Sequence, residues 1–88
     1  KGLLIGKSVN EDKRREIKDF ITNYPDIEKA LNIITIQMGN DIMLAVKVKM
    51  KEGLTARQLI QTINKCEASI KGKFTEIKWI FFEPDNKE

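Results

Sequence analysis

The segment from Asp41 to Met50 constrains the fold of this chain most strongly, because apolar residues stand at every second position. These residues are Ile42, Leu44, Val46, Val48 and Met50. Successive side chains of a strand point to opposite faces of a sheet, so the segment is predicted to be a strand with one buried face. The β-branched segment 30–38 precedes it, and Gly39-Asn40-Asp41 between them is typical of a turn, which predicts an antiparallel hairpin.

A helix is predicted before this hairpin, from about Ser8 to Asn23. Ser8 and Glu11 have the Ser-x-x-Glu spacing of a capping box, in which two side chains satisfy backbone groups at the start of a helix. Pro25 ends the helix, because the residue before proline is driven out of the helical region.

A second helix is predicted after the hairpin, beginning at Thr55, with Gln58 completing a second capping box and Gly72 ending the helix. Its predicted core stripe is Leu59, Ile63, Cys66 and Ile70, with Ala56 and Ile60 beside it. A last strand is predicted from about Ile77 to Glu83.

The predicted order is therefore αββαβ in one domain over residues 8–85, with a tail at 86–88. It describes an α+β two-layer sandwich, with two helices on one face of a three-stranded sheet. This arrangement is that of a ferredoxin-like or metallochaperone-like fold without its first strand.

The last strand is apolar on both faces. By simple alternation Ile80 and Phe82 lie on one face, and the other carries Ile77, Trp79, Phe81 and Glu83. The helices can cover only one face, so an exposed aromatic patch is predicted, and such patches mark interfaces. The alternative is that local twist or a bulge shifts the alternation and one of these rings caps the core.

Charge and length exclude several classes of protein. The net charge is +3, but the basic residues are interleaved with acidic ones, so we expect no nucleic-acid partner. Even the densest basic run, Lys13-Arg14-Arg15, has acidic neighbours on both sides and is expected to be a solvated helix face. No apolar run approaches the roughly 20 residues that a membrane-spanning helix needs.

The residues offer little for catalysis or metal binding. The chain has no histidine, and its single cysteine, Cys66, falls on the predicted core stripe, so we expect neither an enzyme nor a disulfide. No glycine-rich phosphate-binding loop is present. Glu83 and Asp85 are weak candidates for a carboxylate metal site, and a solvated strand end is the simpler interpretation.

Several strings, taken together and in order, resemble the cytoplasmic domain of the cation diffusion facilitator family. They are Leu3-Leu4-Ile5-Gly6-Lys7-Ser8, Tyr24-Pro25-Asp26-Ile27, Thr35-Ile36-Gln37-Met38-Gly39, Leu54-Thr55 with Glu67 near the end of the second helix, and Ile80-Phe81-Phe82-Glu83-Pro84-Asp85. The resemblance covers nearly the whole chain.

This resemblance implies the domain of a transporter at the cytoplasmic face of a membrane. A membrane domain of six helices would precede Lys1, with residues 1–7 as the connection, and would exchange Zn2+ or a similar divalent ion for protons. The ion would be the transported substrate, and no cofactor is expected in this chain. The domain would form a V-shaped homodimer, which in several members binds regulatory metal at its interface.

The sequence departs from the family at these metal positions. The corresponding residues are Leu31, Lys47, Phe81 and Glu83, and of these only Glu83 offers a metal ligand. Gln37 stands where many relatives carry histidine. Contacts between subunits are therefore expected in place of ions, and the predicted dimer interface is Leu31, Met43, Ala45, Trp79 and Phe81.

Two other functions compete with the transporter domain. A free-standing αβ binding module for RNA or a regulatory ligand could stack bases on Trp79 and Phe81 beside Lys47 and Lys49. The first strand and the Lys/Arg-Gly-Phe signature of an RNA-recognition motif are, however, missing. A small enzyme built on Glu83 and Asp85 has no visible base or nucleophile.

Overall fold

A computed structural model describes residues 7–86. Its elements are β1 (Lys7–Ser8), α1 (Glu11–Thr22), β2 (Ile27–Met38), β3 (Asp41–Met50), α2 (Ala56–Lys73) and β4 (Ile77–Pro84). The predicted αββαβ order is confirmed, and the two-residue strand β1 precedes it. Residues 1–6 of the predicted connection, and residues 87–88 of the predicted tail, lie outside the described range.

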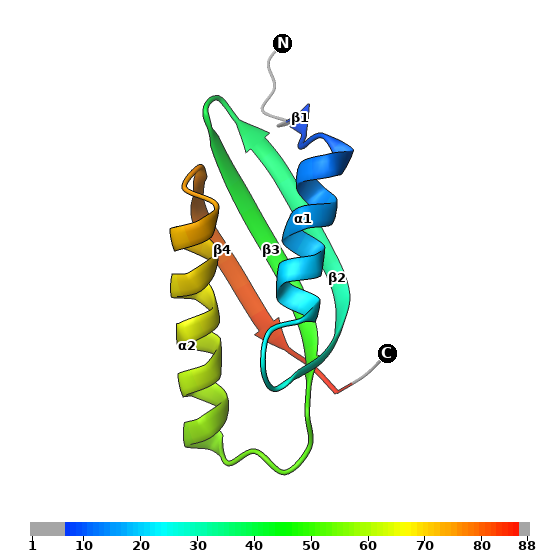
Figure 1. Ribbon diagram of the computed structural model, residues 1–88, viewed down its shortest axis with the longest axis vertical. Helices are drawn as coiled ribbons and strands as arrows, with labels where there is room; N and C mark the ends of the chain where they lie inside the picture. Colours follow the sequence, from blue (N-terminus) through cyan, green and yellow to red (C-terminus); the bar gives the residue numbers. More distant parts are fainter. Residues whose placement is uncertain (1–6, 87–88) are drawn as a thin grey trace.

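The sheet has the strand order β1-β2-β3-β4 (Figure 1). Strands β1, β2 and β3 pair antiparallel, and β4 pairs parallel to β3, so β3 lies between two long neighbours. A parallel pair needs a long crossover, and helix α2 supplies it. Both helices cover the same face of the sheet, as predicted.

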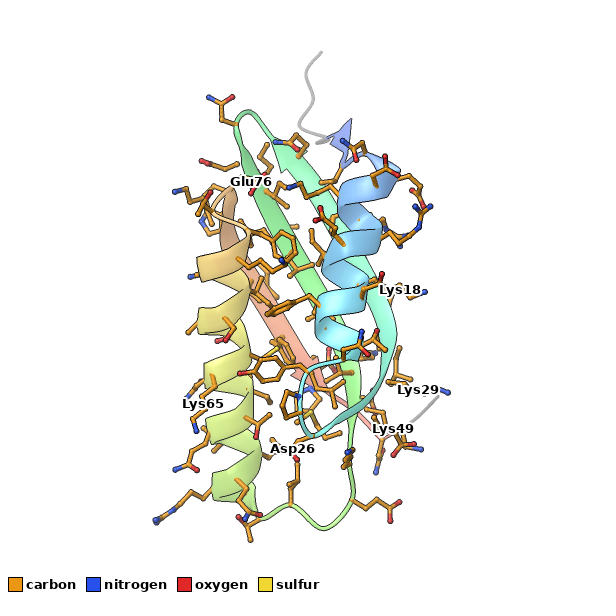
Figure 2. All side chains as sticks on the ribbon, in the orientation of Figure 1. Lys18, Asp26, Lys29, Lys49, Lys65 and Glu76 are labelled. Carbon is orange, nitrogen blue, oxygen red and sulfur yellow. The ribbon has the colours of Figure 1, made fainter. Side chains whose placement is uncertain are left out.

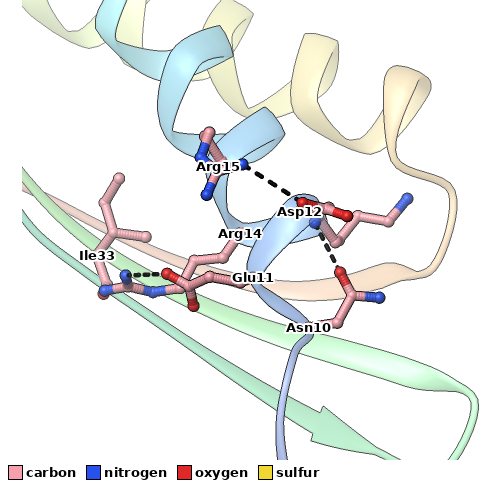
Figure 3. Close-up of polar contacts among 7 residues, drawn as sticks. Asn10, Glu11, Asp12, Arg14, Arg15 and Ile33 are labelled. Atoms are coloured by element: carbon pink, nitrogen blue, oxygen red, sulfur yellow. Dashed lines mark hydrogen bonds and ion pairs between the residues drawn. The ribbon is translucent and has the colours of Figure 1, made fainter.

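Helix α1 starts later than the sequence suggested. Asn10 is its N-cap, and the backbone N–H of Lys13 donates to Asn10 Oδ1 at 2.8 Å (Figure 3). The predicted cap, Ser8, pairs instead with Ile36 in the β1–β2 ladder, so the capping box with Glu11 was wrong. Pairing with a distant strand overrode the local helix signal.

Helix α2 begins as predicted. The backbone N–H of Gln58 donates to Thr55 Oγ1 at 3.1 Å, and the N–H of Thr55 donates to Gln58 Oε1 at 2.9 Å. The helix continues through Gly72, and its C-cap is Phe74, so the predicted stop at Gly72 was wrong.

The core lies between the helices and one face of the sheet (Figure 2). Fully buried side chains come from both layers: Ile17, Ile21, Ile42, Leu44, Val48, Cys66, Ile70 and Ile77. On α2 the predicted stripe is graded, since Cys66 and Ile70 are fully buried whereas Leu59 and Ile63 are half-buried. The predicted buried face of β3 is confirmed along its whole length.

A bulge near the start of β4 changes the predicted faces of that strand. Ile42 pairs with Ile77, but its neighbour Met43 pairs with Trp79, so Lys78 is an extra residue. Ile77 is therefore buried in the core, and placing it beside Trp79 and Phe81 was wrong. The shift follows from strand pairing, which local alternation does not encode.

Candidate functional site

One face of the sheet carries no helix, and we call it the open face. Its rows follow from strand register: Ile36–Met43–Trp79, Ile34–Ala45–Phe81 and Asn32–Lys47–Glu83, with Met38, Asp41, Lys29 and Lys49 at the two ends. In β3 these residues alternate with the buried set, which places them opposite the core.

The upper rows of the open face, toward the Gly39–Asn40 turn, are apolar and exposed. Ile34, Met38, Trp79 and Phe81 have exposed fractions of 46%, 48%, 46% and 60%. In the described part of the chain the fifth exposed large apolar residue is Ile60 on α2, at 57%. Large apolar side chains thus gather on this face, and a gathering of this kind marks an interaction surface.

A hollow of about 320 Å³ lies within the open face. Ile34 and Phe81 border it on either side of Ala45, and Asn32, Lys47 and Glu83 border it toward the next row. Ala45 is the strand partner of both Ile34 and Phe81. Its small side chain therefore forms the base of the hollow between two large side chains.

The lower end of the open face is charged but internally neutralised. Lys47 Nζ lies 3.6 Å from Asp85 Oδ2, and Lys49 Nζ lies 3.7 Å from Glu28 Oε2. The backbone N–H of Asp85 also donates to the carbonyl of Val48 at 2.8 Å, which anchors the end of β4 against β3. The lysines that could attract phosphate in an RNA-binding module are therefore engaged by carboxylates.

Four of the five predicted interface residues lie together on the open face, namely Met43, Ala45, Trp79 and Phe81. Leu31 does not join their rows. The register passes from Ala30 directly to Asn32, so Leu31 is a bulge residue and is half-buried, and Asn32 stands beside Lys47 instead.

The predicted interface did not include three residues of β2 that border it, namely Ile34, Ile36 and Met38. Apolar residues occupy both parities of this strand, as in Ile33, Ile34 and Ile36, so alternation alone could not assign the faces. The bulge at Leu31 is what places Ile33 in the core and Ile34 on the open face.

The donor groups near the open face do not fit a zinc site. No three His, Cys, Asp or Glu side chains gather in the described range 7–86. Asp85 is paired with Lys47, and Glu83 is the strand partner of the same lysine, which places a cation beside both candidate carboxylates. Zinc sites are built mostly from Cys and His.

Cys66 lies in the core, between α2 and the helix-covered face of the sheet. Its side chain is fully buried, and this burial raises the pKa of the thiol to about 12, with a smaller contribution from Glu67. A thiol of this kind stays protonated at neutral pH and is a poor nucleophile and metal ligand.

Comparison with known proteins identifies the family. Residues 9–82 match the family model described as cation efflux protein, cytoplasmic domain. No helix in the described part of the chain is long and apolar enough to span a membrane. A search of curated proteins found no match.

Among solved structures, the fold is similar to that of the MamM CTD. A nickel form of one variant gives a TM-score of 0.80 at 16% identity, over 90% of this chain and 100% of that chain. A cadmium form of another variant gives 0.79 at 17% identity, over 89% and 98%. At this identity the likeness shows a shared fold, and the family match covers most of the chain. The resemblance noted from the sequence is confirmed: the chain belongs to the cation diffusion facilitator family, as the cytoplasmic domain of a cation efflux protein.

Proposed function

We propose that this domain holds two copies of a divalent cation transporter together by pairing its open face with that of a second copy. The observation that carries the proposal is the contrast between a helix-covered face and a face with four exposed large apolar side chains. Two sheets can pack face to face with their side chains interdigitated, about 10 Å apart. A second copy of the same face offers such a sheet.

The transport function proposed for the whole protein is export of Zn2+ or a similar divalent ion in exchange for protons, by a membrane domain that precedes Lys1. Family membership supports this assignment. The nickel and cadmium forms of the MamM CTD show that divalent metals have been bound to a domain of this fold in that protein. In this chain the metal is proposed as transported substrate, with the cytoplasmic domain acting as a dimer clamp that needs no regulatory metal.

Truncating the open face tests the dimer. Trp79→Ala and Phe81→Ala should each weaken dimerisation by about 30-fold or more, the usual effect of removing a central aromatic anchor. Sedimentation velocity over a concentration series measures the shift, and far-UV circular dichroism checks that the fold is intact. Ile60→Ala is the matched control, because Ile60 is equally exposed but lies on α2. A wild-type domain that remains monomeric at high micromolar concentration contradicts the proposal.

Metal titration tests the proposal that the dimer needs no regulatory metal. Isothermal titration with Zn2+ should show no stoichiometric sub-micromolar binding, because the chain lacks histidine and its cysteine is buried. Sedimentation coefficients should be the same with Zn2+ and with chelator. One tight Zn2+ per chain, lost in Glu83→Ala or Asp85→Ala, would restore a metal-sensing role.

A further inference from the structure

The hollow above Ala45 has a shape that a flat partner surface cannot fill. Ile34, Ala45 and Phe81 are direct strand partners in one row, and the outer two are large and exposed. The hollow of about 320 Å³ that they border extends to Asn32, Lys47 and Glu83 in the next row, and the small side chain of Ala45 lies at its base between Ile34 and Phe81. Protein interfaces and interiors pack with few voids larger than a water molecule, so a void of this size against a partner would forfeit much of the contact.

The side chain best placed to fill the hollow belongs to the same patch. Phe81 has the largest exposed fraction of the large apolar residues in the described range, 60%, and it borders the hollow itself. A two-fold interface joins the same patch on both subunits, so a projecting group and a recess on one patch can satisfy each other reciprocally. One two-fold axis between Phe81 and Ala45 inserts both rings at once.

We propose that, in the homodimer, the hollow above Ala45 is a socket for Phe81 of the partner subunit. This inference rests on the proposed function, because it requires that the open faces pair. The two phenyl rings then lie next to one another at the centre of the interface, each between Ile34 and Phe81 of the opposite copy. Ala45 becomes a residue that determines which partner surface fits, although it contributes almost no contact area itself.

The affinity of the Ala45→Leu dimer distinguishes a socket from an interface that depends only on the apolar area it buries. The substitution adds apolar surface to the open face and removes none, so an interface held by apolar area alone would keep its affinity or gain. A socket would be blocked by the larger side chain. Because the socket occurs twice in the dimer, we expect the dissociation constant to rise by about 10- to 100-fold. Ala45→Val should give a smaller loss, and it keeps a residue that favours strands should the leucine variant fold poorly.

Ala68→Leu is the matched control, since Ala68 is exposed on α2 and its enlargement should leave dimerisation unchanged. A double variant adds a direct test of the contact between the two positions. In the Ala45→Leu background, Phe81→Ala should weaken the dimer by much less than it does in the wild type, because the ring can no longer enter.

Sedimentation equilibrium of the wild type, Trp79→Ala, Ala45→Val and Ala45→Leu gives distinguishable outcomes. The socket is supported if all three variants dimerise more weakly than the wild type and Ala45→Leu is weaker than Ala45→Val. If Trp79→Ala weakens the dimer but both Ala45 variants associate as tightly as the wild type, the socket is wrong and the open-face dimer stands. If the wild type does not dimerise, or Trp79→Ala has no effect, both proposals fail.

Discussion

Strand β3 contributes five side chains to each face of the sheet, and the two sets have different roles. On the core face, Ile42, Leu44, Val46, Val48 and Met50 are all buried beneath the helices. On the open face, Asp41, Met43, Ala45, Lys47 and Lys49 are all half-buried and include both charged and apolar groups. Both sets belong to one strand with β2 and β4 as neighbours, so the difference in burial follows from helix coverage of one face.

This comparison separates folding from association within one sheet. Burial of the core face supplies the apolar driving force for folding the monomer. The open face can keep lysines at one end because their charges are paired at the surface, and it can keep exposed aromatic rings at the other because a second copy is proposed to cover them. Substitutions on the two faces should therefore affect different measurements.

The largest difference in unfolding free energy is expected between alanine substitutions at two adjacent residues, Ile33 and Ile34. Ile33 is 6% exposed and Ile34 is 46% exposed, because they point to opposite faces. Ile33→Ala should lower the free energy of unfolding by about 2–5 kcal/mol, the usual cost of a core truncation. Ile34→Ala should change it by only about 0.5 kcal/mol in the monomer.

Urea denaturation measures both variants, and a Phe81→Ala background keeps the protein monomeric so that association does not add to the stability. Equal losses for the two isoleucines would show that the open face also contributes to folding of the monomer.

Thiol labelling of Cys66 tests whether the core stays closed in the folded protein. The pKa of Cys66 rises from 9.0 to about 12, which lowers the thiolate fraction near neutral pH by about 1000-fold, and the buried sulfur is also shielded from reagents. Labelling by a disulfide reagent should therefore be limited by unfolding and should accelerate in urea in step with it. Rapid labelling of the folded protein would show that α2 opens locally from the core.

The smallest effect is expected for the charged end of the open face. The Lys47–Asp85 pair is 3.6 Å long, and the Lys47 side chain is 42% exposed, so solvent screens the interaction. Asp85→Asn should change the unfolding free energy by about 1 kcal/mol or less, and Lys47→Gln should behave alike. A larger loss in urea denaturation, removed in high salt, would show that this end of the sheet depends on its ion pairs.

The sequence predicted the elements better than their details, and the reasons are physical. The alternation in β3 and the Thr55–Gln58 capping box are local patterns, so both were confirmed. The start of α1 was misplaced because Ser8 pairs with the distant strand β2, and Asn10, an equally good capping residue, took its place. Tertiary pairing decided between two adequate local signals.

Bulges explain what the sequence could not show about the open face. Leu31 in β2 and Lys78 in β4 are extra residues with no partner in the ladder to β3, and each shifts the faces of its strand locally. The predicted aromatic patch was confirmed because Trp79 and Phe81 both follow the bulge and lie two residues apart, so they share one face. Leu31 and Ile77 were misplaced because each lies at a bulge or directly before one.

Trp79 permits the most direct test of the proposal that a second copy covers the open face, since it is the only tryptophan in the chain. Its acrylamide quenching can be measured across the same concentration series that sedimentation uses to follow dimerisation. We expect the quenching constant to fall, and the emission to shift to the blue, in step with the dimer fraction, while Phe81→Ala remains fully quenchable over that range. Dimers in which Trp79 stays as accessible as it is in the monomer would place the interface elsewhere and contradict the account.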